Sequence, residues 1–325
     1  MKTTIIIPLY NGAKYITRCL DSLSSQSYRD FEILVVDDNS TDESIAFCER
    51  FGVNLIRTPH NFGYAQAINY GVSKVDTDAI VILNQDTYAD PDWLKNMVSS
   101  ISQNGADMVA PNVLDLRTYP RKLQVGSPIN FYPPLGMLYF GEIVKDCCPT
   151  NVIPGTGCLI TRKVIDRLGL PFDDRFFMYW EDVDFSIRAI ENGMSLIYQP
   201  KAVLWHRFHN ASIPAMKLVT RNIHFILIKH FGLSFWMKAL KWLAIQHLHL
   251  VKHYHNDYGY SYATCLEVIS TAWLDAIAQY RRFRTKNFCS QYLRISDDIL
   301  FNWVGKSLSH RQTIRLLGKR ILLKG

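Results

Sequence analysis

The stretch Ile33-Leu34-Val35-Val36-Asp37-Asp38-Asn39-Ser40-Thr41-Asp42 decides the fold class of this chain. Its apolar half predicts a buried strand over residues 32 to 37, and the polar half marks the end of that strand. Ser40 followed three residues later by Glu43 is the pattern of a capping box, so a helix is expected from Ser40 to about Arg50. A buried strand that leads into a helix is typical of a parallel sheet covered by helices on both faces.

The same alternation of strand and helix patterns extends on both sides of this stretch, over the first 110 residues. Further strands are expected at residues 3 to 8, 53 to 56, 79 to 83 and 108 to 110, and helices at 14 to 25, 65 to 72 and 93 to 101. The pattern predicts an α/β fold with a mainly parallel central sheet flanked by helices. Polar residues follow several of the strands, at the sheet edge where ligands bind in such folds.

The pattern changes in the second half of the chain. Residues 117 to 150 are rich in proline and aromatic side chains, which predicts short strands and loops. Gly155-Thr156-Gly157 precedes another strand and a short helix, and a helix over 180 to 192 is expected to end at Gly193. Two last strands are expected at 195 to 198 and 203 to 206. Beyond residue 210 the composition becomes helical, aromatic and basic.

Composition excludes several classes of protein. The chain has 325 residues, of which 48% are hydrophobic and 20% charged, so it is not a mostly disordered chain. No apolar run approaches the ~18 residues of a membrane-spanning helix. No signal peptide is visible ahead of Ile5-Ile6-Ile7, and the seven cysteines have irregular spacing. We therefore expect a cytoplasmic protein without a disulfide framework.

Charge divides the chain into two parts. Residues 1 to 209 carry 19 Lys and Arg against 24 Asp and Glu, a balance of −5, whereas residues 210 to 325 carry 17 against 5, a balance of +12. We therefore expect two modules, a domain at 1–209 and a helical, basic C-terminal extension at 210–325. On charge alone, the extension could face nucleic acid or an anionic membrane surface.

Three acidic motifs and one histidine are candidates for chemistry. The pair Asp37-Asp38 can accept hydrogen bonds from a nucleobase or a ribose, although a plain turn explains it equally well. In Asn84-Gln85-Asp86-Thr87 a single carboxylate suits a divalent cation that also binds phosphate oxygens, and turn chemistry is again the alternative. His206 follows a strand, and a lone histidine is more often structural than a ligand.

The third acidic motif, Glu181-Asp182-Val183-Asp184, opens the helix expected at 180 to 192. Carboxylates near a helix N-terminus are stabilised by the helix dipole, so the motif can be purely structural. Asp184 is one turn before Arg188 and is expected to pair with it. Asp182 lies on a different face and can point elsewhere.

In order and spacing, these motifs resemble those of family 2 glycosyltransferases with the GT-A fold, and most closely the rhamnosyltransferase-like branch. The resemblance covers about residues 3 to 210. It rests on Ile6-Ile7-Pro8-Leu9-Tyr10-Asn11, Gln26-Ser27-Tyr28-Arg29-Asp30-Phe31-Glu32, the run from Val35 to Asp42, Asn61-Phe62-Gly63-Tyr64-Ala65, Leu83-Asn84-Gln85-Asp86-Thr87, Phe176-Phe177-Met178-Tyr179-Trp180-Glu181-Asp182-Val183-Asp184, and His206.

The resemblance implies a role for each matching residue. Asp182 corresponds to the catalytic base, and Asp86 to the metal ligand of the family's Asp-x-Asp motif, with His206 as a second ligand. Asn84 stands where many relatives have aspartate, which keeps a hydrogen-bonding group and removes one charge. The remaining matches would contact the nucleotide of the donor, and they are Pro8, Tyr10, Asp37, Asp38, Asn61, Gly63 and Asn84.

The implied activity is that of an inverting, metal-dependent transferase that moves a sugar from a nucleotide-diphosphate donor to a hydroxyl of a glycan or lipid-linked glycan, in surface polysaccharide synthesis. Mg²⁺ or Mn²⁺ would neutralise the charge of the leaving diphosphate. One general base suffices for in-line displacement, and the resemblance offers no carboxylate nucleophile for retention. Asn84 favours a dTDP-sugar, so dTDP-rhamnose is the first candidate donor and a UDP-hexose the second.

Other classes of function fit less well. A receiver-type signalling domain would be about a third of this length, and its acceptor pattern does not match Asn84-Gln85-Asp86. A nucleic-acid-binding protein is suggested only by the basic extension, and a sugar-binding relative without activity conflicts with the intact set of motifs. His249 and His253 share a helical face, but no further ligand completes a metal site. We expect the extension to bind the cytoplasmic membrane surface, with packing against the catalytic domain as the alternative.

Overall fold

A computed structural model describes residues 1–119, 127–141, 143–207, 212–283 and 288–304 of the chain. Its centre is a nine-stranded sheet with the order β3-β2-β1-β4-β10-β6-β11-β5, in which β9 pairs with β11. The strands of this sheet are β1 (Thr3–Leu9), β2 (Phe31–Asp37), β3 (Asn54–Arg57), β4 (Ala79–Ile82), β5 (Thr87–Ala89), β6 (Met108–Asp115), β9 (Cys148–Pro149), β10 (Cys158–Thr161) and β11 (Leu196–His206).

The sheet has a parallel half and a mixed half. β3, β2, β1 and β4 run parallel, as the alternating pattern of the first 110 residues predicts. β10 then runs antiparallel between β4 and β6, whereas β6 and β11 are parallel to each other. β5 and β9 both pair antiparallel with β11. The reversal at β10 brings the chain back through the middle of the sheet, so residues just before β10 lie beside the carboxyl end of β4.

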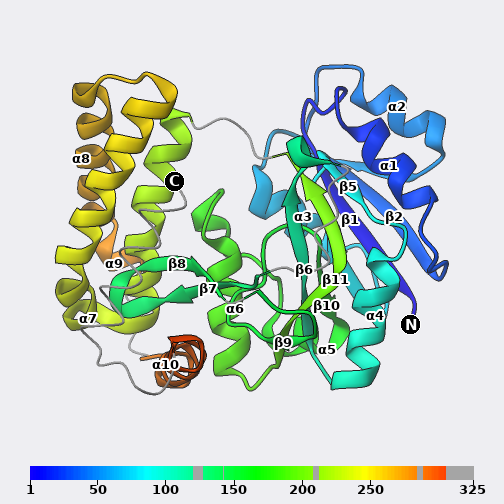
Figure 1. The fold of residues 1–325 in the computed structure, drawn as a ribbon. Coiled ribbons are helices and arrows are strands. Elements are labelled where there is room, and N and C mark those ends of the chain that lie inside the picture. Colours follow the sequence, from blue (N-terminus) through cyan, green and yellow to red (C-terminus); the bar gives the residue numbers. More distant parts are fainter. Residues whose placement is uncertain (120–126, 142, 208–211, 284–287, 305–325) are drawn as a thin grey trace.

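Helices cover both faces of the sheet (Figure 1). In β1, Ile5 and Ile7 pack in one core with α1 and α4, while Ile6 packs in a second core with α3, α6 and the C-terminal helices. This alternation is the two-residue period of a strand buried on both sides. The helices of this part are α1 (Ile16–Ser24), α2 (Ser44–Phe51), α3 (Tyr64–Val72), α4 (Trp93–Asn104), α5 (Arg162–Leu168) and α6 (Glu181–Glu191), with short 3₁₀ turns η1 (Leu116–Thr118), η2 (Pro133–Leu135) and η3 (Asp174–Phe176).

The prediction of a capping box at Ser40 is wrong, because Ser40 does not cap a helix. The amide of Ser40 donates to the Asp37 carboxylate, and its hydroxyl accepts from the amide of Asn11, so the side chain is engaged outside the helix. Helix α2 starts only at Ser44, whose amide donates to Asp42 Oδ1. The contact with Asn11, 29 residues away, replaced the local cap.

The two last strands expected at 195 to 198 and 203 to 206 form one long strand, β11. Its pairing with β6 shifts register between Gln199 and Val203, an irregularity that includes Pro200. Proline cannot donate to the ladder, so an interruption at this residue is expected on physical grounds. Gly193 has a φ of 78° and follows the C-cap Asn192, so α6 ends where the sequence predicts.

The chain beyond residue 210 is helical, as expected. α7 (Ile213–Tyr258) and α8 (Tyr262–Ala278) form an antiparallel pair beside the sheet part. The short helix α9 (Tyr280–Phe283) follows α8, and α10 (Ser290–Val304) lies below the pair in Figure 1. The hairpin of β7 (Ile129–Tyr132) and β8 (Met137–Phe140) reaches from the sheet part toward these helices. None of the described helices is both long and apolar enough to span a lipid bilayer.

The first part of α7 belongs to the core of the sheet part. Residues 222 to 231 are all buried, and Phe225 and Ile226 lie in the same apolar cluster as Ile6 of β1. At Gly232, with φ 78° and ψ 175°, the helix is kinked. Beyond the kink, α7 packs against α8 and exposes its other face. The helices after residue 210 therefore share one continuous core with the sheet.

Candidate active site

Three predicted site residues meet at the carboxyl edge of the sheet. Asn84 follows β4, Asp86 directly precedes β5, and His206 is the last residue of β11. β5 pairs with β11, and the amide of Arg207 donates to the Asp86 carbonyl, which places the two side chains side by side. His206 Nε2 lies 3.3 Å from Asp86 Oδ1 and 3.2 Å from Asn84 Nδ2. Backbone pairing thus builds a compact group of one carboxylate, one imidazole and one amide.

The chemistry of this group fits a divalent cation. Two ligands bound side by side to one octahedral ion at ~2.1 Å lie about 3 Å apart, close to the 3.3 Å between the Asp86 and His206 atoms. A carboxylate oxygen with an imidazole nitrogen suits Mn²⁺ and also accommodates Mg²⁺. Within the described residues no cluster of three or more acidic, histidine or cysteine side chains forms a closed cage. The pair can therefore supply part of a coordination sphere, with open positions for other oxygens.

Asp182 is connected to this group through two other residues. It lies in the first turn of α6, and its Oδ2 accepts a hydrogen bond of 3.0 Å from the amide of Gly155. The Tyr64 hydroxyl donates to the Gly155 carbonyl oxygen and also lies 3.1 Å from Asn84 Oδ1. A continuous set of contacts thus leads from His206 through Asn84, Tyr64 and Gly155 to Asp182.

The surroundings of Asp182 change its acidity. Burial raises the pKa of the Asp182 carboxyl above its ordinary value, while hydrogen bonds from the Val183 and Gly155 amides act in the opposite direction. The neighbouring Glu181 is buried, and its pKa is raised much further by burial and by the charge of Asp182. Of the two adjacent acids, Asp182 is therefore the one whose charged form is stabilised by the backbone amides of Val183 and Gly155.

Asp37 and Asp38 are both buried at the end of β2 and already accept hydrogen bonds from the protein. Asp37 Oδ2 lies 3.1 Å from Arg57 Nε. Asp38 accepts from the amides of Phe62 and Gly63 and from the Thr58 hydroxyl. The Asp38 carboxylate therefore fixes the loop that leads into α3.

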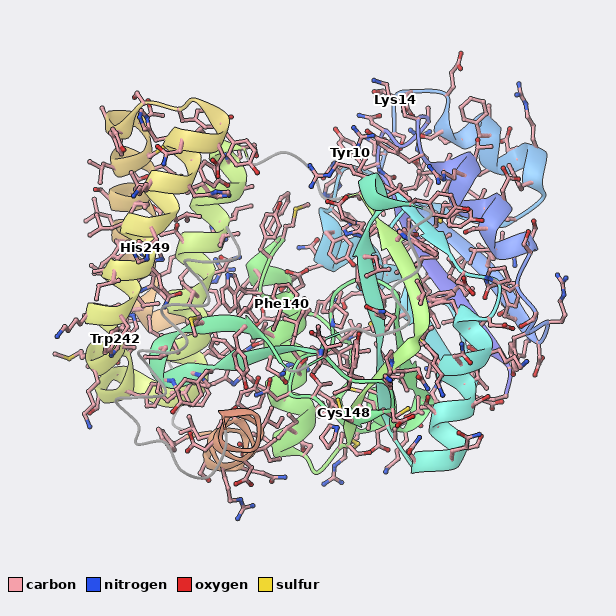
Figure 2. All side chains as sticks on the ribbon, in the orientation of Figure 1. Tyr10, Lys14, Phe140, Cys148, Trp242 and His249 are labelled. Atoms are coloured by element: carbon pink, nitrogen blue, oxygen red, sulfur yellow. The ribbon has the colours of Figure 1, made fainter. Side chains whose placement is uncertain are left out.

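The other predicted nucleotide contacts lie at the same edge of the sheet. Tyr10, half exposed, marks the upper end of the sheet part in Figure 2, and its amide donates to the Gln85 side chain. Pro8 lies where the pairing of β1 with β4 has already ended, so its missing donor breaks no ladder. Asn61 is exposed, and its Oδ1 accepts from the amide of Gly63.

The backbone conformation at position 63 and the neighbouring side chain both require glycine there. Gly63 has a φ of 80°, which favours glycine, and a Cβ atom there would lie 2.5 Å from the ring of Phe177. The sequence reading expected the close neighbour of this glycine to be a nucleotide. In the structure a side chain that precedes α6 occupies one side of it.

Sequence reasoning assigned no role to Tyr64, Gly155 or Thr156. Tyr64 and Gly155 join Asp182 to Asn84, and the Thr156 hydroxyl accepts from the Asn84 amide. Tyr64 belongs to a motif that carried the resemblance, and Gly155-Thr156-Gly157 stood out before a strand. Those signals marked the right segments, but the contacts join residues 20 to 91 positions apart and no local pattern encodes them.

Comparisons with known proteins identify relatives of this chain. The family model described as glycosyl transferase family 2 matches residues 4–169. The pneumococcal glycosyltransferase GlyG is 32% identical over 150 residues, which are 45% of this chain and 45% of GlyG. An N-acetylglucosaminyl-diphospho-decaprenol L-rhamnosyltransferase of Mycobacterium tuberculosis is 27% identical over 77% of this chain and 91% of its own. The chain thus spans less than half of GlyG, but most of the mycobacterial relative.

A solved structure supports the fold. The mannosyltransferase PcManGT of Pyrobaculum calidifontis, in complex with GDP-Man and Mn²⁺, matches with a TM-score of 0.55 and 18% identity, over 93% of this chain and 87% of that one. The match confirms the GT-A fold, and the mycobacterial relative confirms the resemblance to the rhamnosyltransferase-like branch. Because the family model covers slightly more than half of the 325 residues, the chain belongs to glycosyl transferase family 2.

Proposed function

We propose that the protein is an inverting, metal-dependent glycosyltransferase that uses a nucleotide-diphosphate sugar. The observation that supports this most strongly is the connected group at the sheet edge, in which Asp182 is linked through Gly155 and Tyr64 to Asn84. Asp86 and His206 lie beside Asn84. One base and one cation site, a short distance apart, are what an in-line displacement at an anomeric carbon requires.

Asp182 is the proposed general base. Its carboxylate takes the proton of the acceptor hydroxyl while that oxygen attacks the anomeric carbon and the diphosphate leaves from the opposite side, so the configuration is inverted. The raised pKa of Asp182 makes its carboxylate a stronger base than an exposed aspartate. The amides of Val183 and Gly155 hold it in one orientation. No second carboxylate is proposed as a nucleophile, so retention is not expected.

Asp86 and His206 are the residues that would hold the cation. A bound Mn²⁺ or Mg²⁺ would neutralise the negative charge of the diphosphate. Asn84 orients both of its neighbours, since its Nδ2 faces His206 and its Oδ1 faces Tyr64. An aspartate at position 84 would add a charge next to Asp86, whereas the amide supplies hydrogen bonding only.

The donor is proposed to bind along the carboxyl edge formed by β1, β2 and the loop before α3. dTDP-rhamnose is the first candidate and a UDP-hexose the second, which is consistent with the rhamnosyltransferase named among the relatives. The residues proposed to contact the donor are Pro8, Tyr10, Asp37, Asp38, Asn61, Gly63 and Asn84. Because Asp38 already holds the amides of Phe62 and Gly63, it would act on the nucleotide partly through this loop.

The acceptor is proposed to be a glycan or a lipid-linked glycan, and the protein to work at an anionic membrane surface from the cytoplasmic side. Support comes from the +12 balance after residue 209 and from large apolar side chains exposed on α7 and α8. Met237, Leu248 and Leu274 are 59, 60 and 64% exposed. Another part of the basic segment, residues 315 to 324, lies outside the described residues.

The test is a screen of nucleotide sugars, read as donor hydrolysis and as transfer to glycan acceptors, followed by Asp182→Asn. We expect this variant to lose transfer by ~10²–10⁴-fold while it still binds the nucleotide, because the amide keeps the shape but cannot accept the proton. Asp166→Asn, at an exposed position of α5, is the matched control and should retain activity. Near-normal turnover by Asp182→Asn would refute the assignment of the base. Absence of transfer by the wild-type protein with every donor would refute the proposed activity.

A further inference from the structure

The loop that precedes the proposed base has an unusual backbone. Phe177, Tyr179 and Trp180 have φ values of 66°, 68° and 72°, in the left-handed region that bulky residues rarely adopt. The amide of Met178 donates to the carbonyl of Phe176, which makes Phe177 the centre of a tight three-residue turn of the rarer, strained kind. Such conformations are unfavourable for residues other than glycine, so the surrounding structure must hold the 177–180 loop in place.

Asn222 of α7 supplies the main contacts that hold it. This side chain is fully buried, and its Nδ2 lies 3.1, 2.9 and 2.9 Å from the carbonyl oxygens of Phe176, Met178 and Tyr179. A single amide group therefore contacts two carbonyls of the 177–180 loop and the carbonyl of the residue before it. One turn earlier on α7, the carbonyl of Val219 accepts from the Trp180 indole at 3.0 Å.

The 177–180 loop touches both halves of the proposed site. At its end, the carbonyl of Trp180 accepts the first helical hydrogen bond of α6, from Asp184, so the loop sets the start of the helix turn that carries Asp182. At its beginning, the ring of Phe177 packs on Gly63, whose amide is held by Asp38. A shift of the loop would therefore move the base relative to the donor loop.

We infer that Asn222 is a positioning residue for the proposed reaction: by holding the 177–180 loop, it fixes the orientation in which Asp182 faces Gly155. The inference rests on the proposed function and extends it, because it makes α7 a part of the catalytic apparatus. The fold is built to allow this, since residues 222 to 231 of α7 are buried in the core of the sheet part. The hydrogen-bond partners of the Asn222 side chain among the described residues are Arg221 and the carbonyls of residues 176, 178 and 179, and none of them belongs to the residues proposed to bind the donor, the cation or the acceptor hydroxyl.

The first variant is Asn222→Asp, which keeps the shape of the side chain but removes both hydrogens and turns a carboxylate toward three carbonyls. We expect kcat to fall at least ~10-fold, because small misplacements of a catalytic group are costly, while the donor KM changes less than about threefold. Hydrogen exchange of the Gly155 amide should accelerate, since this amide donates to Asp182. That exchange is measured without any substrate.

The pH profile gives a second readout. The hydrogen bond from Gly155 lowers the pKa of Asp182, so its loss raises that pKa, and the acidic limb of kcat should move to higher pH. Asn222→Asp also introduces a carboxyl whose charge would raise the same pKa, so the movement reports geometry when the uncharged variant Trp180→Phe moves the limb in the same direction. The titratable groups that face Asp182 are unchanged in the variant, and they are Glu181, Tyr64 of α3, Cys158 of β10 and Tyr292 of α10.

Two further variants complete the test. Asn112→Asp removes an equally buried amide that donates to the Pro200 carbonyl, away from the loop, and should leave Gly155 exchange and the acidic limb unchanged. Trp180→Phe removes only the indole donor to Val219 and should produce a smaller effect in the same direction. This variant decides the question if Asn222→Asp does not fold.

The inference would be overturned if folded Asn222→Asp showed wild-type exchange of the Gly155 amide and an unmoved acidic limb. The same result for Trp180→Phe would overturn it if Asn222→Asp does not fold. A wild-type protein without transfer would refute the proposed function, while Gly155 exchange would still decide whether Asn222 orients Asp182.

Discussion

At the scale of single residues, Asp86 and His206 illustrate how a site is built from backbone pairing. They are brought together by the antiparallel pairing of β5 with β11, and Asn84, which follows β4, contacts His206. The three side chains come from three different strand ends. The donor set is small, so affinity for a cation should depend strongly on each of the two ligands.

Removal of metal is therefore expected to abolish transfer, and Mn²⁺ or Mg²⁺ should restore it. Asp86→Asn should remove the response to metal, and His206→Ala should raise the Mn²⁺ concentration needed for half-maximal activity by ~10-fold or more. The measurement is activity in chelator followed by metal titration. Asp107→Asn is the control, because Asp107 is also buried but precedes β6, at the opposite edge of the sheet. Full activity in chelator would contradict the metal assignment.

A second residue-scale feature is Asp184, the buried carboxylate that joins α6 to α7. Its oxygens lie 3.0 Å from Arg188 Nε, 2.6 Å from Lys229 Nζ and 2.7 Å from His230 Nε2. Burial alone would raise the pKa of Asp184, but the hydrogen bond from His230 and the charges of Arg188 and Lys229 lower it far below its usual range. The pair of Asp184 with Arg188 is the one that their spacing in the sequence predicts.

Asp184→Asn is expected to lower the free energy of unfolding by about 3–5 kcal/mol at pH 7, because it leaves Lys229 in a buried site with less negative charge. Since the folded pKa is depressed, the contribution of Asp184 is complete above the unfolded value of ~3.9 and is lost as the pH falls below it. Urea unfolding at pH 7 and at pH 3.5 checks both statements. Asp174→Asn, at an exposed position, should change stability by less than about 0.5 kcal/mol. A difference between wild type and Asp184→Asn that grows as the pH falls would contradict this account.

At the scale of elements, α7 consists of two helical segments separated by a kink at Gly232. Residues 222 to 231, before the kink, are all buried, and the part beyond the kink has one face on α8 and the other exposed. Gly232 separates the two, with φ 78° and ψ 175°, a region that is essentially restricted to glycine. A Cβ atom at this position would meet no atom within 4 Å, so the requirement comes from the backbone alone.

Gly232→Ala should therefore destabilise the protein by about 1–3 kcal/mol through backbone strain. Gly259→Ala is the matched comparison, because Gly259 also faces open space but has φ 72° and ψ 14°, the left-handed helical region that other residues can enter at a cost of about 1 kcal/mol. Denaturant unfolding of both variants measures the difference. Equal effects, or a larger loss in Gly259→Ala, would show that the kink does not depend on the conformation of Gly232.

At the scale of the whole molecule, the arrangement of α7 and α8 bears on where the protein works. Trp242 and His249, which Figure 2 labels, lie on the part of α7 beyond the kink, on the side of the molecule away from the sheet. This part of α7 and α8 together expose seven large aliphatic side chains among the described residues, and they are Leu233, Met237, Ile245, Leu248, Leu266, Leu274 and Ile277. Lys238, Lys241 and Lys252 are also exposed there. Apolar and basic side chains on one helical pair suit an anionic lipid surface.

We expect the full chain to sediment with anionic vesicles and not with neutral ones, and to be released by high salt. Each Lys or Arg near the surface contributes on the order of 1 kcal/mol, so several of them give reversible binding. The double variant Leu248→Ser and Leu274→Ser should weaken binding, whereas Leu170→Ser, 48% exposed in the sheet part, should not. Recovery of the wild-type protein in the supernatant with and without anionic lipid would leave these helices a packing role only.

The sequence by itself determined the features that depend on residues close together in the chain. Alternating apolar and polar runs predicted the parallel strands β1 to β4 and the helices between them, because burial on both sides of a strand requires such runs. The pair Asp184 and Arg188 and the end of α6 at Gly193 also follow from neighbours within one turn. The motifs placed Asn84, Asp86 and His206 at strand ends, which the structure confirms.

Only the tertiary structure decided the features that depend on distant contacts. The capping box at Ser40 failed because Asn11 and Asp37 engage its hydroxyl and its amide. The reversal at β10 and the joining of two expected strands into β11 depend on which strands become neighbours. The contacts of Tyr64 with Gly155 span 91 residues, and Asn222 reaches the loop before Asp182 from a separate helix. A local pattern can offer a side chain to a sheet edge, but only the packing of the whole chain determines what that side chain meets.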